Sequence, residues 1–140
     1  MKELIDILHR ENCSLVVRDV NGEITIYRKP GVRDLEDLLR SDTDRLRGAD
    51  IADKVIGKAA AGMAVYGGVH SVYGEVLSRH ALPILNEAGV DYSYGTLVDV
   101  IVREMSDMRC PLEQIVAKCK TPREIVETLY HHWYQKLVKA

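Results

Sequence analysis

The sequence predicts a three-layer α/β/α protein with one mixed sheet of four or five strands, and three observations support this fold class. First, two short β-rich runs flank Asn21-Gly22 and predict a hairpin. Second, strand-like runs at 69–78 and from 90 alternate with helical segments, as in right-handed strand-helix-strand crossovers. Third, two helix-start signals near the C-terminal end add helices that can cover the sheet.

The N-terminal half is expected to supply a helix, the hairpin and two further helices. Residues 2–11 have apolar positions at helical spacing, and the hairpin at 13–29 is expected to close with a type I′ turn. A short amphipathic helix follows over 32–42, and then a polar surface loop. The segment 50–68 reads as a helix that is apolar almost all round, with Asp50 as its N-cap.

The C-terminal half is expected to continue with a strand at 69–78, a helix ended by Gly89, another strand and two helices. The stretch CPLE places Pro111 and Glu113 in a first helical turn, and TPRE begins the next helix with Thr121 as its N-cap. The last helix has an apolar stripe that predicts core packing, or a homodimer face if it is exposed. Its main members are Ile125, Leu129, Trp133 and Leu137.

Composition narrows the classes of function. The formal net charge is −2 and the pI is about 6.2, so no basic field favours nucleic acid. No apolar run is long enough for a membrane span. The cysteines Cys13, Cys110 and Cys119 form neither a disulfide framework nor a paired metal motif, and Cys13 and Cys119 read as core residues. We expect a cytoplasmic protein that forms a single domain over 1–140, without a metal or cofactor.

Two separated segments carry a family resemblance. The stretch DKVIGKAAAGMAVYGG, with Asp53, Gly57 and Lys58, and the stretch CPLEQIV, with Cys110 and Glu113, resemble the DUF1893 family. The resemblance implies a cytidine deaminase-like fold. It covers most of the chain, from the hairpin to Glu113.

Deaminase chemistry is not expected, because the superfamily's zinc motifs are missing. That chemistry needs His-x-Glu at the start of the second core helix and Pro-Cys-x-x-Cys at the start of the third. On the predicted elements these helices open DIADKVIG and SRHALPIL, which contain neither motif. His80 alone lies near a ligand position, and one imidazole cannot form a three-ligand zinc site. Whether the chain is an enzyme stays open, but it is not a standard zinc-dependent deaminase.

The deaminase plan implies a crevice where three helices begin at the carboxyl edge of the strands. Free N–H groups there favour a small anionic or nucleotide-like ligand. The candidate ligand-binding residues are Asp53, Lys58, His80, Cys110 and Glu113. Lys58 is either the ligand's cation or part of a solvated helix stripe shared with Lys54, and His80 either binds or only caps its helix.

Two other functions stay open. In the first, Cys110 at a helix N-terminus is a reactive or redox-sensitive thiol, which predicts faster alkylation at Cys110 than at Cys13 or Cys119. The alternative for this residue is a small buried hydrophobic side chain. In the second, the protein is a structural or partner-binding module, which predicts an exposed apolar helix face and an oligomer.

Overall fold

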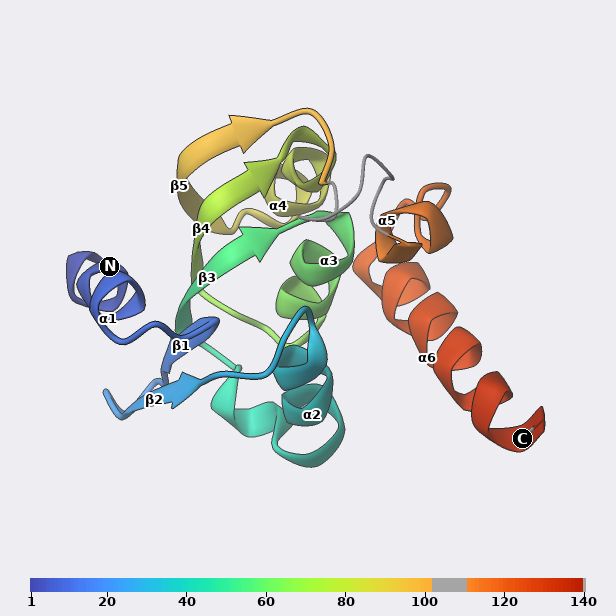
Figure 1. Ribbon diagram of the computed structural model, residues 1–140, viewed down its shortest axis with the longest axis horizontal. Helices are drawn as coiled ribbons and strands as arrows, with labels where there is room; N and C mark the ends of the chain where they lie inside the picture. The colour runs from blue at the N-terminus through green and yellow to red at the C-terminus, as the bar shows by residue number, and fades with distance from the viewer. Residues whose placement is uncertain (102–110, 140) are drawn as a thin grey trace.

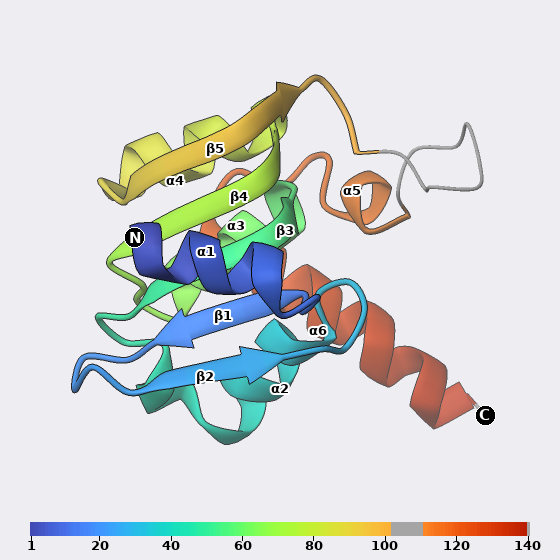
Figure 2. The ribbon, with the colours of Figure 1, turned by 60° about the vertical axis from the view of Figure 1, so that its left-hand side comes forward.

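A five-stranded mixed sheet organises the molecule, in the order β2-β1-β3-β4-β5 (Figure 2). The computed structural model describes residues 1–101 and 111–139. The strands are β1 (Leu15–Arg18), β2 (Ile24–Tyr27), β3 (Asp50–Ile56), β4 (Ser71–Ser78) and β5 (Asp91–Val98). The strand β1 is antiparallel to both β2 and β3, whereas β3, β4 and β5 are parallel. The expectation of a mixed sheet with helices is therefore confirmed.

Helices cover both faces of this sheet unequally (Figure 1). The helix α1 (Lys2–Arg10) lies on one face, where Leu4 and Leu8 pack with Val16, Ala52 and Tyr73. The other face carries the larger core and the remaining helices. These are α2 (Arg33–Ser41), α3 (Lys58–Tyr66), α4 (Leu82–Ala88), α5 (Pro111–Ile115) and α6 (Pro122–Lys139), with short 3₁₀ turns η1 (Thr43–Arg45) and η2 (Arg79–Ala81).

The predicted helix over 50–68 is wrong in its first half. Asp50–Ile56 forms β3, and α3 begins only at Lys58, after Gly57 as N-cap. The adjacent residues Ile51 and Ala52 are both fully buried because β3 lies in the middle of the sheet and is covered on both faces. Such a strand lacks the alternation of apolar and polar residues that would distinguish it from a helix. Lys54 and Lys58 consequently do not share a helix face.

The N-terminal hairpin is confirmed, but its type I′ turn is not. Gly22 has a positive φ of 89°, whereas Asn21 does not, and type I′ requires positive φ at both central residues. The N–H of Gly22 donates to the Asp19 carbonyl over 2.9 Å. The Asp19 side chain also accepts from the N–H groups of Asn21 and Glu23, and these bonds explain the longer turn with a glycine at its end.

The C-terminal expectations agree with the structure where it describes them. The strand at 69–78 corresponds to β4, and the helix after it ends at Gly89 in the left-handed conformation with φ 70°. Thr121 caps α6 by accepting from the N–H of Glu124 over 3.1 Å. Leu129 is fully buried and Trp133 is partly buried against the same core, so this part of the stripe packs as expected.

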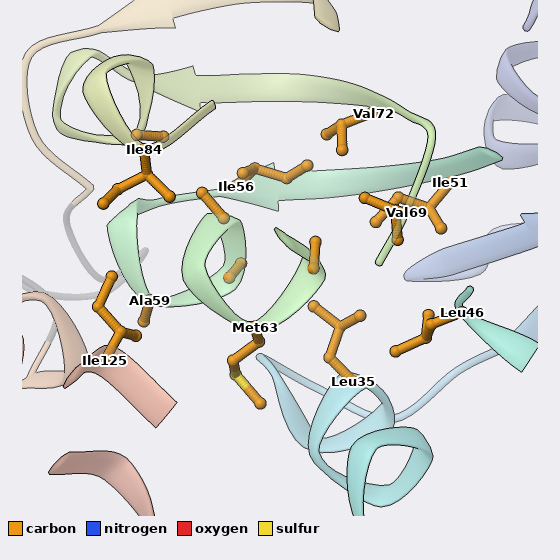
Figure 3. Close-up of a cluster of buried hydrophobic side chains, with 14 of the residues drawn as sticks. Leu35, Leu46, Ile51, Ile56, Ala59, Met63, Val69, Val72, Ile84 and Ile125 are labelled. Carbon is orange, nitrogen blue, oxygen red and sulfur yellow. The ribbon is translucent and has the colours of Figure 1, made fainter. Parts of the chain in front are cut away.

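The helix α3 lies at the centre of the larger core (Figure 3). Leu35 of α2, Ile84 of α4 and Ile125 of α6 all point toward it. The helix α3 itself consists mostly of alanine and glycine, which lets its neighbours approach closely. No helix in the described part of the chain is long and apolar enough to cross a membrane.

Gly62 gives a test of this packing, because a Cβ there would lie 2.6 Å from the side chain of Ile125. Gly62→Ala should destabilise the protein by about 1–3 kcal/mol through overpacking, although Gly→Ala usually stabilises a helix. Urea denaturation measures the change. Combining Gly62→Ala with Ile125→Ala, which removes the two methyl groups that would lie 2.6 and 2.7 Å from the new Cβ, should cost less than the sum of the two single substitutions. Additive losses would contradict the close contact.

Candidate functional site

A hollow of about 320 Å³ opens where β3 ends and α3 begins, and we call it the strand-end pocket. The residues that line it come from the segments just before β1 and α2, from β3, α3 and α5, and from the chain after β5, and most of its surface is apolar. They include Ser14, Val32, Asp53, Val55, Ala60 and Glu113. The topology forms the pocket, because the parallel strand β3 brings its carboxyl end to the edge where α3 starts.

Asp53 is one of two buried carboxylates that line this pocket, the other being Glu113. Asp53 is only 6% exposed, and its Oδ1 accepts a hydrogen bond from the N–H of Val55 over 3.1 Å. Burial, reinforced by the nearby Asp34 carboxylate, raises the pKa of Asp53 from an ordinary value of 3.8 to about 7, against the opposing effect of the backbone donors. The carboxyl group can therefore gain or lose a proton near neutral pH.

Glu113 caps α3 from a distant part of the chain. Its two carboxylate oxygens accept from the N–H groups of Lys58 at 2.8 Å and Ala59 at 3.1 Å. Glu113 lies in the first turn of its own helix α5, as predicted, and its carboxylate also satisfies the N-terminus of α3. Gly57 makes this possible, because a Cβ there would lie 2.5 Å from a Glu113 oxygen.

The predicted site residues are only partly brought together. Asp53 and Glu113 both line the strand-end pocket, but Lys58 meets Glu113 through its backbone N–H, and its ammonium donates to the carbonyl of Ala117 over 3.0 Å. His80 is exposed in η2 and does not line this pocket; its N–H is capped by the Ser78 hydroxyl over 3.1 Å. Cys110 lies outside the described residues. Its proposed reactivity therefore stays a prediction.

Two polar residues beside the pocket, Ser14 and Asp34, were not among the predicted site residues. Ser14 lines the pocket, and its hydroxyl donates to the Lys29 carbonyl over 2.8 Å. The Asp34 carboxylate, buried on α2, accepts from the Lys29 N–H over 3.0 Å and lies 3.5 Å from the Ser14 hydroxyl. The signal was present in the sequence, because Asp34 lies four residues before the buried Leu38 and thus falls on the apolar stripe of its helix.

A larger hollow of about 580 Å³ adjoins this pocket between α2 and Trp133 of α6. Its charged side chains pair with one another on the surface, as Lys29 does with Asp37 and Arg40 with Asp37. It has no buried polar group comparable with Asp53, so the smaller hollow is the better candidate site. In the part of the chain that the structure describes, no three His, Cys, Asp or Glu side chains are grouped closely enough to hold a metal ion.

Fold and site together define an α/β protein with a central mixed sheet and an apolar pocket at the carboxyl end of β3. Residues 3–132 match the model of a family described as "Domain of unknown function (DUF1893)". Because this match spans most of the chain, the protein belongs to the DUF1893 family.

A solved structure agrees with this assignment. The crystal structure of a DUF1893 family protein from Thermotoga maritima matches this one with a TM-score of 0.83, over 94% of this chain and 88% of that chain. The two sequences are 23% identical, so this likeness shows the fold alone. A search of curated proteins gives no match.

Loss of the Glu113 cap should weaken the fold. Glu113→Gln leaves one oxygen for two N–H groups and turns an amide donor toward one of them, which should cost about 2 kcal/mol in the free energy of unfolding. Denaturant titration measures this. Glu127→Gln is a matched control in which only an exposed ion pair with Arg123 is lost, at a cost of at most about 1 kcal/mol. An equal effect of the two substitutions would contradict the cap.

Asp53 should make stability fall as the pH rises. Its pKa is raised in the folded state, so the folded chain binds more protons than the unfolded chain between about pH 4 and 7. Ionisation of Asp53 thus costs stability on the order of a few kcal/mol across that window. Asp53→Asn should remove this cost and be more stable relative to the wild type at pH 8 than at pH 5, as followed by thermal unfolding at both pH values.

Asp50 serves as a control because its pKa is shifted in the opposite direction to that of Asp53. Despite opposition from partial burial, hydrogen bonds from Ser71, Arg18 and His70 lower its pKa to about 2. Asp50 is therefore already ionised at pH 5, and the stability that it contributes would be lost only as the pH falls below about 4. Asp50→Asn should therefore destabilise the protein at both pH 5 and pH 8. If the difference in stability between Asp53→Asn and the wild type were the same at both pH values, the buried, proton-binding state of Asp53 would be contradicted.

Proposed function

We propose that this protein binds a small molecule in the strand-end pocket, on a deaminase-like scaffold without the zinc centre. The observation that carries the proposal is a mostly apolar hollow at the carboxyl end of β3, lined by the deeply buried carboxyl group of Asp53. Ligand pockets are commonly lined by apolar groups with a few polar side chains that fix orientation, and open α/β sheets commonly bind ligands at this edge.

The observed strands correct the comparison with zinc deaminases. Because Asp50–Ile56 is β3, the second and third core helices are α2 and α3, which open with Val32-Arg33-Asp34 and Gly57-Lys58-Ala59. Neither opening contains His-x-Glu or Pro-Cys-x-x-Cys. These residues supply no zinc ligand of the deaminase type, so the proposal is binding without zinc chemistry.

The geometry also changes the expected chemistry of the ligand. The sequence predicts an anion at a rim of three helix N-termini, where backbone N–H groups attract negative charge, and in the structure the helix that begins beside the pocket is α3. Glu113 already occupies that position with its own carboxylate. A nucleotide-like ligand would therefore meet the pocket through its base or another hydrogen-bond donor, rather than through a phosphate on α3.

Blocking the mouth of the pocket tests the proposal. Val55 lines the pocket and is 44% exposed, so Val55→Trp should fill the space without disturbing the core. The probes are nucleosides, nucleoside monophosphates, phosphosugars and small amines, screened by their effect on the melting temperature. A compound present at a hundred times its Kd stabilises the folded state by about 2.7 kcal/mol. We expect at least one compound to stabilise the wild type and to lose this effect in Val55→Trp.

Val20→Trp is the matched control. Val20 is 71% exposed and lies in the hairpin turn, away from the pocket. It should respond to the same compounds as the wild type. The proposal is wrong if no compound stabilises the protein, or if Val55→Trp responds as fully as Val20→Trp.

A further inference from the structure

Asp53 differs from the other buried carboxylates beside the strand-end pocket in the partners that it has. Glu113 is bonded by two N–H groups of α3, and Asp34 by the Lys29 N–H. The hydrogen bond to Asp53 comes from the backbone N–H of Val55, on its own strand. Within residues 1–101 and 111–133, no side chain donates to its carboxyl group, although this group lines the hollow.

The cations near the pocket are directed elsewhere. The Lys54 ammonium donates to the Asn12 side chain over 3.2 Å, and that of Lys58 donates to the Ala117 carbonyl. The Lys29 ammonium pairs with Asp37 at 2.5 Å. In the part of the chain for which side chains are described, no ion pair includes Asp53. Its charge, once formed, has no counter-ion there.

A buried carboxylate in an apolar pocket favours a ligand that supplies the missing positive charge. Burying an unpaired charge is costly, and a charged N–H donor that reaches it offsets this cost. A ligand carboxylate or phosphate would instead meet the negative charges of both Asp53 and Glu113. A cationic nitrogen group therefore fits this pocket better than an anion does.

We propose that the strand-end pocket binds a ligand whose inner end is a cationic nitrogen group, an ammonium or amidinium, that donates to the Asp53 carboxylate. This inference rests on the proposed function and names the chemical class of its ligand. The apolar part of the ligand contacts Val32, Val55 and Ala60 at the walls. An amidinium suits a carboxylate particularly well, because its two N–H groups are parallel and can bind both oxygens.

The proposal predicts that binding depends on pH through Asp53. The charged groups around it are Asp34 on α2, Glu113 on α5 and Lys54 on β3. Asp34 opposes ionisation of Asp53, and burial opposes it more strongly. Because the cation needs the ionised carboxylate, affinity for the cationic ligand should rise as the pH increases through about 7.

Three compounds of nearly equal shape test the charge preference: benzamidine, which is cationic, benzamide, which is neutral, and benzoate, which is anionic. Binding to the full-length chain is measured by ligand-observed NMR and calorimetry at pH 6 and pH 8. At pH 8 the wild type should bind benzamidine at least tenfold more tightly than benzamide, and benzoate most weakly. Affinity for benzamidine should fall severalfold at pH 6, while affinity for benzamide should change little.

Two variants separate this inference from the proposed function. Asp53→Asn should abolish the preference for benzamidine and its pH dependence, while it retains the affinity of the pocket for benzamide. Val55→Trp should weaken the binding of all three compounds. If benzamide or benzoate binds as well as benzamidine and Val55→Trp weakens that binding, the pocket is real and the cationic preference is wrong. If none of the compounds binds, or Val55→Trp leaves binding unchanged, both the inference and the proposed function are contradicted.

Discussion

The bond between Glu113 and the start of α3 holds the site in place. Two N–H groups of a central buried helix would otherwise lack partners, and one carboxylate from the C-terminal part of the chain satisfies both. The same contact fixes α5 against the pocket, because Glu113 and Leu112 both line it. The position of the pocket therefore depends on a contact between residues about 55 positions apart.

This contact also determines the electrostatic character of the site. A helix N-terminus at the carboxyl edge of a sheet usually attracts an external anion. Here the protein supplies that anion itself, and a second carboxyl group, Asp53, also lines the hollow. The balance of charge at the edge is thereby reversed. The proposed ligand at this edge is therefore cationic, where a free helix N-terminus would favour phosphate.

Much of the fold could be predicted from local patterns, and the errors have physical causes. The hairpin, β4, the Gly89 helix end and the Thr121 cap follow from turn chemistry, alternation and capping, which are properties of adjacent residues. The strand β3 was missed because it is covered on both faces, so its pattern of burial resembles that of a helix. Once β3 was read as a helix, the helices expected at the motif positions were also misplaced.

The candidate site shows the same limit. Asp53 and Glu113 were identified by their types and by the family resemblance, and the structure brings both to one pocket. His80 follows the carboxyl end of β4 at a helix start, as predicted, but it does not line this pocket. The role of Glu113 as the cap of a different helix depends on a tertiary contact, which no pattern within the CPLE segment could indicate. The bond between Glu113 and the start of α3 could not be predicted because the residues that form it lie far apart in the sequence.

Because Gly57 has no side chain, the Glu113 carboxylate can approach it closely, and the residue types at these two positions depend on each other. Any larger residue there would collide with the Glu113 carboxylate, so this glycine is required only as long as the carboxylate is present. A family member that replaced Glu113 with a small residue would be free to change Gly57 as well. Among DUF1893 sequences the residues at these two positions should therefore co-vary. A family member that lacks either residue would need another group to cap the N-terminus of this helix.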